Sequence, residues 1–505
     1  MDKTFYTDIE SICLVNGHRG DSFKIKRGVR QGCPLSMILY IIAQEPMYQA
    51  IKKTQQIEPI SIPSQQIKLL GYADDSTFSV KSDIGIIYIF TILHHFELAS
   101  SIKLNRKKTK IIGFGDWHGR TDWPYNDIKV ETSEIQILGI TFTPDIKCAI
   151  EKSWSHILDN IKQKIRILSQ RYFTIFQRAI VINMIILAKV WYTSHTYPLP
   201  HKYSKLINTE IFKFIWQSKY NPIKRETLFQ SKYEGGLGIF NVFYKAQSIY
   251  ASTFLKQFLN SEENYSLMKY YCALRINPIF NILELPIKTS FTKSKFFDEY
   301  VILIRKLISV NNFPNIFSLD IYRFLLPVCQ PSVNSNINID WKISWKCLNF
   351  KYVNVRERDI IFKFLHGILT TKNRLFQIKK IDSPLCSLCN SIENQLHMFV
   401  QCKKIKNILV FFKEMLNKIC NIKNFDIIKM LHLNCKANKK QRNTAIILTT
   451  AYIGCVWYNR ANTRSIEVQI YKASIIKHNH LLQLILGDNM KKLFTEKFCS
   501  LLENM

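Results

Sequence analysis

The spacing of apolar residues divides the chain into stretches with different expected structures. Residues 1 to about 145 mix strand-like runs with helical patterns, and glycines in segments 17–32 and 113–119 and at Gly71 mark the turns between them. From about residue 154 to 197 the apolar residues recur at the spacing of one helix face. The pattern therefore predicts an α+β region followed by helices.

Helices are expected to continue to about residue 330. Pro198 and Pro200 interrupt the helical pattern, and a further helical stretch includes residues 207–215. The glycine-rich segment 234–238 predicts a sharp turn before the helical pattern resumes.

A polar segment is expected to separate the last third of the chain from the rest. Residues 328–340 are rich in turn formers, and a new unit is expected to begin near Trp341. The chain has no internal repeat of about 20 to 50 residues, which argues against a solenoid. The expected domains are residues 1–145, 146–330 and 331–505.

One apolar segment has to be tested as a possible membrane span. Segment 179–188 is short of the roughly 20 residues that a span needs, contains Asn183 and stops at Lys189. We expect a buried helix there and no transmembrane segment.

The cysteine content indicates the compartment. The chain has 13 cysteines, an odd number, and its first residues lack the pattern of a signal peptide. A reducing compartment, nucleus or cytoplasm, is expected.

The charge of the chain points to a polyanionic partner. Lysine and arginine total 70 against 38 aspartate and glutamate, a formal net charge of +32. Nucleic acid is the expected partner. The alternatives are a basic protein kept in solution by its charge and a protein that binds anionic membrane surfaces, although the apolar helices read as core-facing.

Two adjacent carboxylates are expected at the tip of a hairpin. Strand-like runs at residues 69–72 and 77–80 flank a short segment that contains Asp74 and Asp75. Oxygen ligands of this kind suit Mg²⁺, and two-metal nucleotidyl transfer holds its ions about 3.5–4 Å apart between such carboxylates. The alternative is an ordinary solvated turn.

Two further segments have the composition of nucleotide-binding elements. Gly28 and Gly32 allow a close approach of backbone to a ligand, and Pro34 is placed to start a helix. Lys108 and Lys110 can neutralise phosphate charge. The alternatives are a simple loop before a helix and a solvated basic face.

A compact cysteine and histidine cluster predicts a structural zinc site. Cys386 and Cys389 are followed by His397 and Cys402, which makes three thiolates and one imidazole within 17 residues. Four protein ligands leave no open position for water, so the zinc would not be catalytic. The alternative is a set of buried cysteines with a surface histidine.

The order of these motifs resembles the reverse transcriptases of non-LTR (LINE-type) retrotransposons. Four blocks fit the family's motifs in the same order along the chain: residues 27–36, 71–75, 104–110 and 137–140. The resemblance implies a right-hand polymerase palm, with the fold class α+β, followed by a mainly helical thumb and connection and a small zinc-binding domain.

The resemblance also implies roles for individual residues. Asp74 and Asp75 would be the catalytic carboxylates that bind Mg²⁺. Leu138 and Gly139 would contact the primer. The residues implied to bind the nucleotide or template are Arg30, Gln31, Gly32, Pro34, Tyr72, Lys108 and Lys110.

The resemblance extends beyond the palm. Residues 167–200 and 214–238 resemble the thumb and connection, where Trp191 and Trp216 are expected to be core anchors instead of base-stacking platforms. Elements of this family commonly carry a Cys₃His site near the C-terminus. Lysines surround it here, so template RNA or target DNA is the expected ligand: Lys379, Lys380, Lys403, Lys404 and Lys406. The helical pattern of residues 443–487 suggests no chemistry.

A third catalytic carboxylate has no candidate in the expected position. In the family an aspartate lies several tens of residues before the block that begins at Arg27, and the residues that immediately precede Arg27 look like a hairpin. The acidic residues before that block are Asp2, Asp8, Glu10 and Asp21. We therefore expect a reverse transcriptase fragment that is inactive or weakly active, without the fingers or an endonuclease. The alternative is a catalytically dead, zinc-containing nucleic-acid-binding protein.

Overall fold

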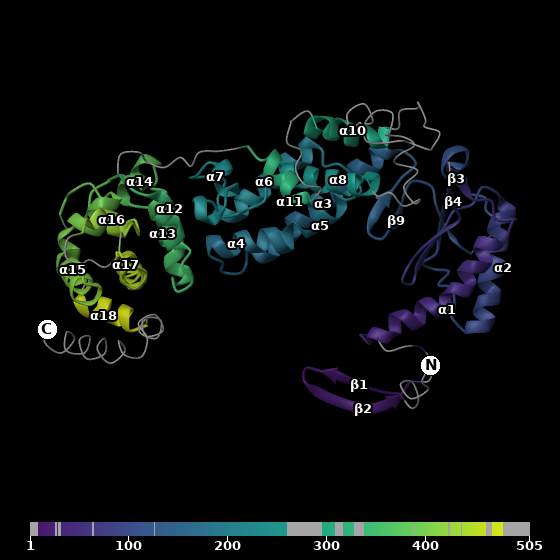
Figure 1. Cartoon of the computed structure of the whole chain (residues 1–505), viewed down its shortest axis with the longest axis horizontal. Coiled ribbons are helices and arrows are strands. Elements are labelled where there is room, and N and C mark those ends of the chain that lie inside the picture. The colour runs from purple at the N-terminus through teal and green to yellow at the C-terminus, as the bar shows by residue number, and fades with distance from the viewer. Residues whose placement is uncertain are drawn as a thin grey trace. The chain divides into compact units, whose positions relative to one another are not determined.

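The computed structural model describes most of the chain as helices and short strands (Figure 1). Contacts group the chain into two units, which are described separately: residues 1–155, 195–198 and 249–321, and residues 156–194, 199–248 and 322–505. The structure describes residues 9–25, 28, 32–62, 65–125, 127–259, 295–308, 317–327, 338–387, 389–422, 425–435, 437–460 and 467–477.

The first unit begins with an antiparallel hairpin of β1 (Glu10–Val15) and β2 (His18–Lys24). Asn16 and Gly17 form its two-residue turn and both have positive φ, 49° and 85°. Asn-Gly adopts this turn readily because both residues tolerate the left-handed region. The hairpin expected before the Gly28 block is therefore confirmed.

Two helices and two hairpins follow in the first unit. Pro34 starts α1 at the position where its missing N–H costs nothing, as expected. A core of Met47 and Ile51 from α1, Ile57, and Ile89 and Leu93 from α2 joins these elements. Their bounds are α1 (Pro34–Lys53), β3 (Ile60–Ile62), β4 (Gln65–Ile67), β5 (Leu69–Tyr72), β6 (Asp75–Phe78) and α2 (Asp83–Ser100).

The rest of the α+β region contains one parallel and one antiparallel strand pair. β7 (Lys110–Ile112) runs parallel to β8 (Lys129–Glu131), and the turn η2 (Gly115–Trp117) lies between them in sequence. β9 (Ile135–Ile137) and β10 (Ile140–Phe142) form a hairpin. The expected mixture of helices and strands is confirmed, and each described sheet has two strands.

Aromatic side chains complete the described core of the first unit. The buried Tyr197 donates a hydrogen bond to the carbonyl of Thr141, 2.8 Å away. Tyr250 and Tyr300 stack with ring centroids 3.5 Å apart. Helix α8 (Val242–Leu259) supplies Tyr250 and α10 (Lys295–Ile308) supplies Tyr300, whereas Tyr197 lies in no helix. Helix α3 (Ile146–Leu168) follows β10 in the chain.

Where the structure describes it, the second unit consists of helices joined by turns and loops, apart from one isolated β-bridge between Leu385 and Ile392. Helices occupy most of residues 156–194 and 207–215, as the apolar spacing predicts. Trp216 is half-buried at the end of α6, and Trp191 packs edge-on against Phe240. The elements before the C-terminal region are α4 (Ile175–Val181), the π-helix η3 (Ile182–Ile186), α5 (Ala188–Thr193), α6 (His201–Trp216), α7 (Arg225–Phe229), η4 (Lys232–Glu234) and α11 (Ser318–Leu325).

The apolar segment 179–188 lies within a longer helical stretch than expected. The stretch Ile175–Thr193 has 19 residues and passes a test of length and composition for a membrane span, which the core helix of a soluble protein also passes. Ile182 and Ile186 are fully buried, whereas Met184 is 71% exposed. The expectation of a buried helix therefore holds for one face only.

Polar side chains fix this helix to the rest of the unit. Asn183, in the π-helix, donates from Nδ2 to the carbonyl of Gly238 at 2.8 Å and accepts from the amide of Phe240 at 3.2 Å. Arg178 is buried and donates to the carbonyl of Ile215 at 2.7 Å. These bonds tie η3 and α4 to the glycine-rich turn and to α6.

The C-terminal region packs around one buried helix, α17. Tyr452 of α17 donates to the carbonyl of Phe399, and Tyr471 donates to the carbonyl of Leu448. Residues 328–337 of the predicted linker, and 461–466 and 478–487 of the predicted helical tail, lie outside the described residues. The elements are α12 (Trp341–Leu348), α13 (Val355–Leu365), α14 (Lys372–Gln377), the π-helix η6 (His397–Gln401), η7 (Lys403–Ile405), α15 (Lys406–Cys420), α16 (Ile427–Leu431), α17 (Lys439–Tyr458) and α18 (Val468–Lys477).

Candidate active site and metal centre

Asp74 and Asp75 lie at the tip of the β5–β6 hairpin. Tyr72 pairs with Asp75 across the strands, which leaves Ala73 and Asp74 as a two-residue turn. The second strand thus begins two residues earlier than the sequence pattern indicates. Ala73 has a φ of 51°, which is unusual for a residue with a Cβ. Both aspartates are exposed, so their carboxylates can reach a ligand at the tip.

Helix α1 holds this hairpin in place. The hydroxyls of Tyr48 and Ser76 share a hydrogen bond of 2.7 Å, and Gln44 Nε2 donates to the Ser76 hydroxyl at 3.3 Å. A Cβ on Gly71 would lie 2.7–2.8 Å from carbons of the Tyr48 ring, closer than atoms can pack. A Cβ at position 71 would therefore force the Tyr48 ring to move, a constraint that sequence reasoning missed.

The electrostatic surroundings of the tip include a tyrosine of α1. Burial, and then the negative charge of Asp74, raise the pKa of Tyr40. Tyr40 therefore stays a neutral phenol beside the tip. Among the described residues, no third carboxylate, histidine or cysteine gathers with Asp74 and Asp75 in a metal-binding group.

The Gly28 block is described only in part. Gly28 and Gly32 have φ values of 92° and 86°, and nothing lies within 4 Å of where a Cβ would be. Glycine is favoured there by the backbone conformation, since no neighbouring atom requires it. Pro34 is exposed at the start of α1. Arg30 and Gln31 lie outside the described residues.

The two lysines expected at phosphate differ in their surroundings. Lys110 lies 2.9 Å from the carboxylate of Glu131, which Lys129 also contacts at 2.8 Å, and these hydrogen bonds lower the pKa of Glu131. Lys110 thus helps to pair β7 with β8. Lys108 is exposed, and no ion pair joins it to an acidic residue in the described ranges.

Leu138 and Gly139 form the exposed turn of the β9–β10 hairpin. Their φ values are 49° and 75°, both in the left-handed region. A branched apolar residue rarely adopts this conformation, so Leu138 is held at the tip at a cost in backbone energy. The structure thus presents an apolar side chain at the position that the resemblance assigns to the primer.

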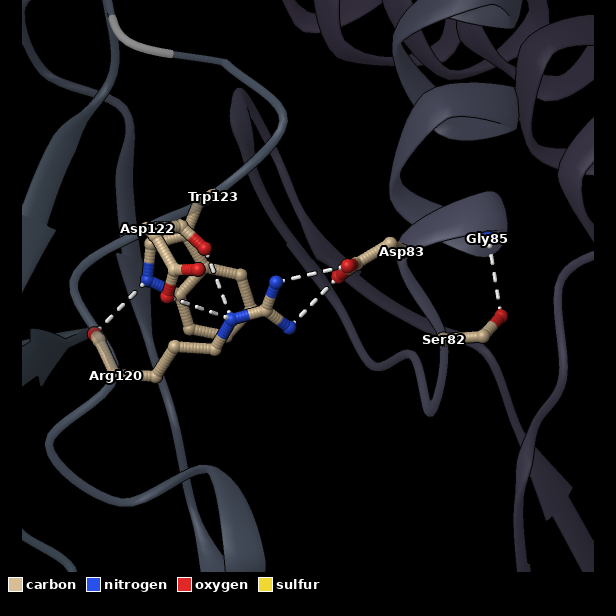
Figure 2. A network of polar contacts seen from close by, with 6 residues as sticks. All are labelled: Ser82, Asp83, Gly85, Arg120, Asp122 and Trp123. Atoms are coloured by element: carbon tan, nitrogen blue, oxygen red, sulfur yellow. Dashed lines mark hydrogen bonds and ion pairs between the residues drawn. The ribbon is translucent and has the colours of Figure 1, made fainter.

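Arg120 connects the loop after β7 to the first residue of α2, and Figure 2 shows its guanidinium aimed at Asp83. Two hydrogen bonds of 2.8 Å join them, and this bonding holds the pKa of Asp83 below its usual range. The guanidinium also lies over the rings of Trp117 and Trp123, 5.4 and 4.6 Å from their centroids. Sequence reasoning treated segment 113–119 only as turns and missed this network.

The network fixes the element that follows the aspartate hairpin. Ser82 caps α2 by accepting from the amide of Gly85 at 3.1 Å (Figure 2). Asp83 then places a negative charge in the first turn, where the helix dipole favours it. Only residues 79–82 join β6 to this capped helix end, so Arg120 also restrains the end of the aspartate hairpin.

Cys386, Cys389, His397 and Cys402 come together as the sequence predicts. Their ligand atoms lie within 4.8 Å of one another. Cys386 Sγ lies 3.9 Å from Cys402 Sγ, and Cys389 Sγ lies 3.4 Å from His397 Nε2. Zn–S bonds of about 2.3 Å and Zn–N bonds of about 2.0 Å at tetrahedral angles give edges of this length. The donor set and its geometry therefore fit zinc.

The local backbone arranges these four ligands. Leu385 and Ile392 form an antiparallel bridge, and Asn390 turns the chain between them with a φ of 52°. The amide of His397 donates to Asn394 Oδ1 at 2.8 Å, at the start of π-helix η6. The wider turn of a π-helix, which is common at functional sites, leads directly to Cys402.

Burial favours a metal over free side chains at this cluster. It lowers the pKa of His397 and raises the pKa of Cys402 to about 12. Neutral imidazole is the form that binds metal, whereas a buried thiolate needs a cation to stabilise it. A divalent ion would satisfy both requirements.

Comparison with known proteins supports a polymerase origin for the first region. Residues 2–142 match the family model described as reverse transcriptase (RNA-dependent DNA polymerase). A segment of 228 residues is 24% identical to the Transposon TX1 uncharacterized 149 kDa protein of Xenopus laevis. This match covers 43% of the chain and 17% of the relative, so the chain corresponds to only a small part of that protein.

Proposed function

We propose that this chain is a fragment of a non-LTR (LINE-type) retrotransposon reverse transcriptase, which copies RNA into DNA. The observation that carries the proposal is the tight hairpin tip with exposed Asp74 and Asp75, within the region that matches the reverse transcriptase model. Two Mg²⁺ ions bound there would activate the primer 3′ oxygen and stabilise the departing pyrophosphate. The net charge of +32 suits template RNA and primer or target DNA.

The other residues have supporting roles in this proposal. Residues 1–145 form a partial palm, 146–330 the thumb and connection, and 331–505 the zinc-containing domain. Lys108 is a better phosphate ligand than Lys110, because Glu131 already neutralises Lys110. The residues proposed to contact nucleotide, template or primer are Arg30, Gln31, Gly32, Pro34, Tyr72, Lys108, Lys110, Leu138 and Gly139.

The polymerase activity of residues 1–505 is proposed to be weak or absent. Two-metal transfer needs more carboxylate than Asp74 and Asp75 supply, and the described residues bring no third ligand to the tip. Loss of one metal ligand usually lowers the rate by orders of magnitude. A carboxylate from outside the described residues would then be needed to restore activity.

Primer extension on an RNA template with Mg²⁺ tests the catalytic part. We expect little or no dNTP incorporation by residues 1–505. Robust incorporation that Asp74→Asn abolishes and Asp116→Asn, at an exposed carboxylate in η2, leaves intact would support the polymerase and overturn the proposed inactivity.

Metal binding tests the tip independently of activity. Fe²⁺ can replace Mg²⁺ and, with peroxide and ascorbate, cuts the backbone near its site. We expect cleavage near residues 72–76 that Asp74→Asn and Asp75→Asn each reduce and Asp116→Asn does not. An identical cleavage pattern in all three variants would count against a metal site at the hairpin.

A second function is favoured by the contrast between the two candidate metal sites. The Cys₃His set has all four ligands within 4.8 Å, whereas the hairpin tip has two carboxylates. A catalytically dead, zinc-containing nucleic-acid-binding protein would keep the first site and need only the basic surface. Tight RNA or DNA binding that Asp74→Asn leaves unchanged, without Fe²⁺ cleavage at the tip, would favour this function.

A further inference from the structure

Four exposed apolar side chains lie on or just after α14 and on the bridge that leads into the Cys₃His cluster. Leu385 and Ile392 pair across the bridge that leads into the cluster, and their side chains remain 39% and 54% exposed. Phe376, on α14, is 44% exposed, and Ile378, just after this helix, is 39% exposed. We refer to these four side chains as the apolar face.

Hydrogen bonds hold α14 against the bridge. The amide of Lys372 donates to Glu393 Oε1 at 3.1 Å, and the amide of Asn373 donates to the Glu393 carbonyl at 3.1 Å. Lys372 Nζ reaches the carbonyl of Leu385 at 3.1 Å. The Lys372 side chain therefore faces the bridge, and Phe376, four residues later, lies on the same side of α14. The apolar face is therefore built on a fixed backbone.

The segment that carries the apolar face is rich in positive charge. Residues 372–406 contain seven lysines and arginines but only two acidic residues, Asp382 and Glu393. Glu393 is already occupied by the backbone amide of Lys372. Lys379 and Lys380 follow α14, are exposed, and pair with no acidic residue in the described part of the chain. The surroundings suit a polyanion that also offers apolar surface.

Single-stranded nucleic acid has both properties, whereas a duplex offers only one of them at its surface. Unpaired bases expose flat apolar faces that stack on aromatic side chains, while their phosphates contact lysine. In a duplex these faces are stacked inside the helix. A basic rim alone would suit either form, so the exposed ring of Phe376 decides between them.

We propose that the apolar face binds unpaired bases of single-stranded nucleic acid, with Phe376 as the stacking side chain and Lys379 and Lys380 at the phosphates. The inference rests on the nucleic-acid binding in the proposed function and does not depend on polymerase activity. In this proposal the zinc site has a structural role, since the metal would hold in place the bridge that carries Leu385 and Ile392.

Photocrosslinking to zinc-loaded residues 1–505 tests the proposal. The crosslinking probes are a single-stranded RNA and a single-stranded DNA of about 12 nucleotides, each with 5-iodouracil, and a duplex of the same sequence. An abasic phosphodiester of the same length is used for affinity measurements. We expect single strands, but not the duplex, to crosslink to the peptide that contains Phe376. Phe376→Ala should remove this crosslink and weaken single-strand binding about fivefold or more.

Controls separate stacking from folding and from charge. Phe376→Tyr should retain the crosslink, and Val410→Ala, at a 50% exposed apolar residue of α15, should change nothing. Zinc content and the affinity for the abasic probe should be equal in wild type and Phe376→Ala. Single-strand crosslinks that map only elsewhere would overturn the base-binding face and leave the proposed function standing. No binding of any probe would overturn both.

Discussion

The hydroxyl of Tyr48 lies 2.7 Å from that of Ser76, while the Tyr48 ring closes over Gly71 on the facing strand. One side chain of α1 thus contacts both strands of the hairpin that carries Asp74 and Asp75. The position of the carboxylates therefore depends on a residue outside the motif that identifies them.

Gly71→Ala is predicted to loosen the aspartate hairpin, because the new Cβ would overlap the Tyr48 ring. Hydrogen–deuterium exchange of residues 69–78 should accelerate at least several-fold. Gly20→Ala is the matched control, since its Cβ would meet the nearest atom at an ordinary 3.6 Å. Equal exchange in the hairpins of both variants would show that Tyr48 does not restrain the tip. Tyr48→Phe should have a smaller effect, of about 1 kcal/mol, because only the hydrogen bond is lost.

The ion pair of Asp83 with Arg120 predicts acid sensitivity at the start of α2. The pKa of Asp83 is lower in the folded protein than the usual value of about 3.9, so the pair stabilises fully above that value. The contribution is lost as the pH falls below about 4 through the folded pKa. Exchange of residues 83–88 measured from pH 5 to 3 should rise accordingly.

Two variants check this assignment to Asp83. Asp83→Asn should show faster exchange at pH 5 and a weaker dependence on acid. Arg120→Lys keeps the charge but cannot make the two parallel hydrogen bonds, so it should fall between wild type and Arg120→Ala. An acid response of unchanged size in Asp83→Asn would assign it to another carboxylate.

His366 predicts a second and separate pH effect, in the second unit. Its Nε2 donates to the carbonyl of Gly235 at 2.9 Å, and burial lowers its pKa to about 4. Because the unfolded value is about 6.5, the neutral folded form is fully favoured above pH 6.5 and loses stability as the pH falls towards 4. The loss amounts to about 3 kcal/mol by pH 4.

Denaturant unfolding of this unit, followed by exchange of residues 355–365 at pH 7.5, 5.5 and 4.5, measures the effect of His366. His366→Gln should be less stable than wild type at pH 7.5 and should lose less stability on acidification. A steeper loss in the variant than in wild type would contradict the role of His366.

Zinc is predicted to be structural at the Cys₃His cluster. Cys402→Ser should reduce bound zinc from about one equivalent to a small fraction and open residues 385–402 to proteolysis. Cys13→Ser, at an exposed cysteine of the first hairpin, should retain the metal. Full zinc content in Cys402→Ser, measured by mass spectrometry of the metal, would exclude this ligand set.

Motifs whose members are close in sequence could be predicted, whereas contacts between distant elements could not. The four Cys₃His ligands lie in one short segment, so their spacing alone predicts that they meet. The contact of Tyr48 with Gly71 depends on how α1 packs on the hairpin, which no local pattern encodes. The pairing of Lys110 with Glu131 likewise requires β7 and β8 to be neighbours.

The helical segment 179–188 shows a limit of periodicity. Apolar spacing predicts a buried helix, and Ile182 and Ile186 are buried, but Met184 is exposed. The π-helical turn at Ile182–Ile186 changes the rotation per residue, so an α-helical count assigns residues to the wrong face. Asn183 uses this turn to reach Gly238 and Phe240.

The hydrogen bond from Tyr452 to the carbonyl of Phe399 has a consequence for synthesis on the ribosome. The four cysteine and histidine ligands emerge before α17, which covers the π-helix between His397 and Cys402. A nascent chain that binds zinc at these ligands would therefore do so while the buried side of that helix is still open to water. A premature stop between residues 402 and 439 would leave a product that keeps the four ligands but exposes the side chains that α17 buries.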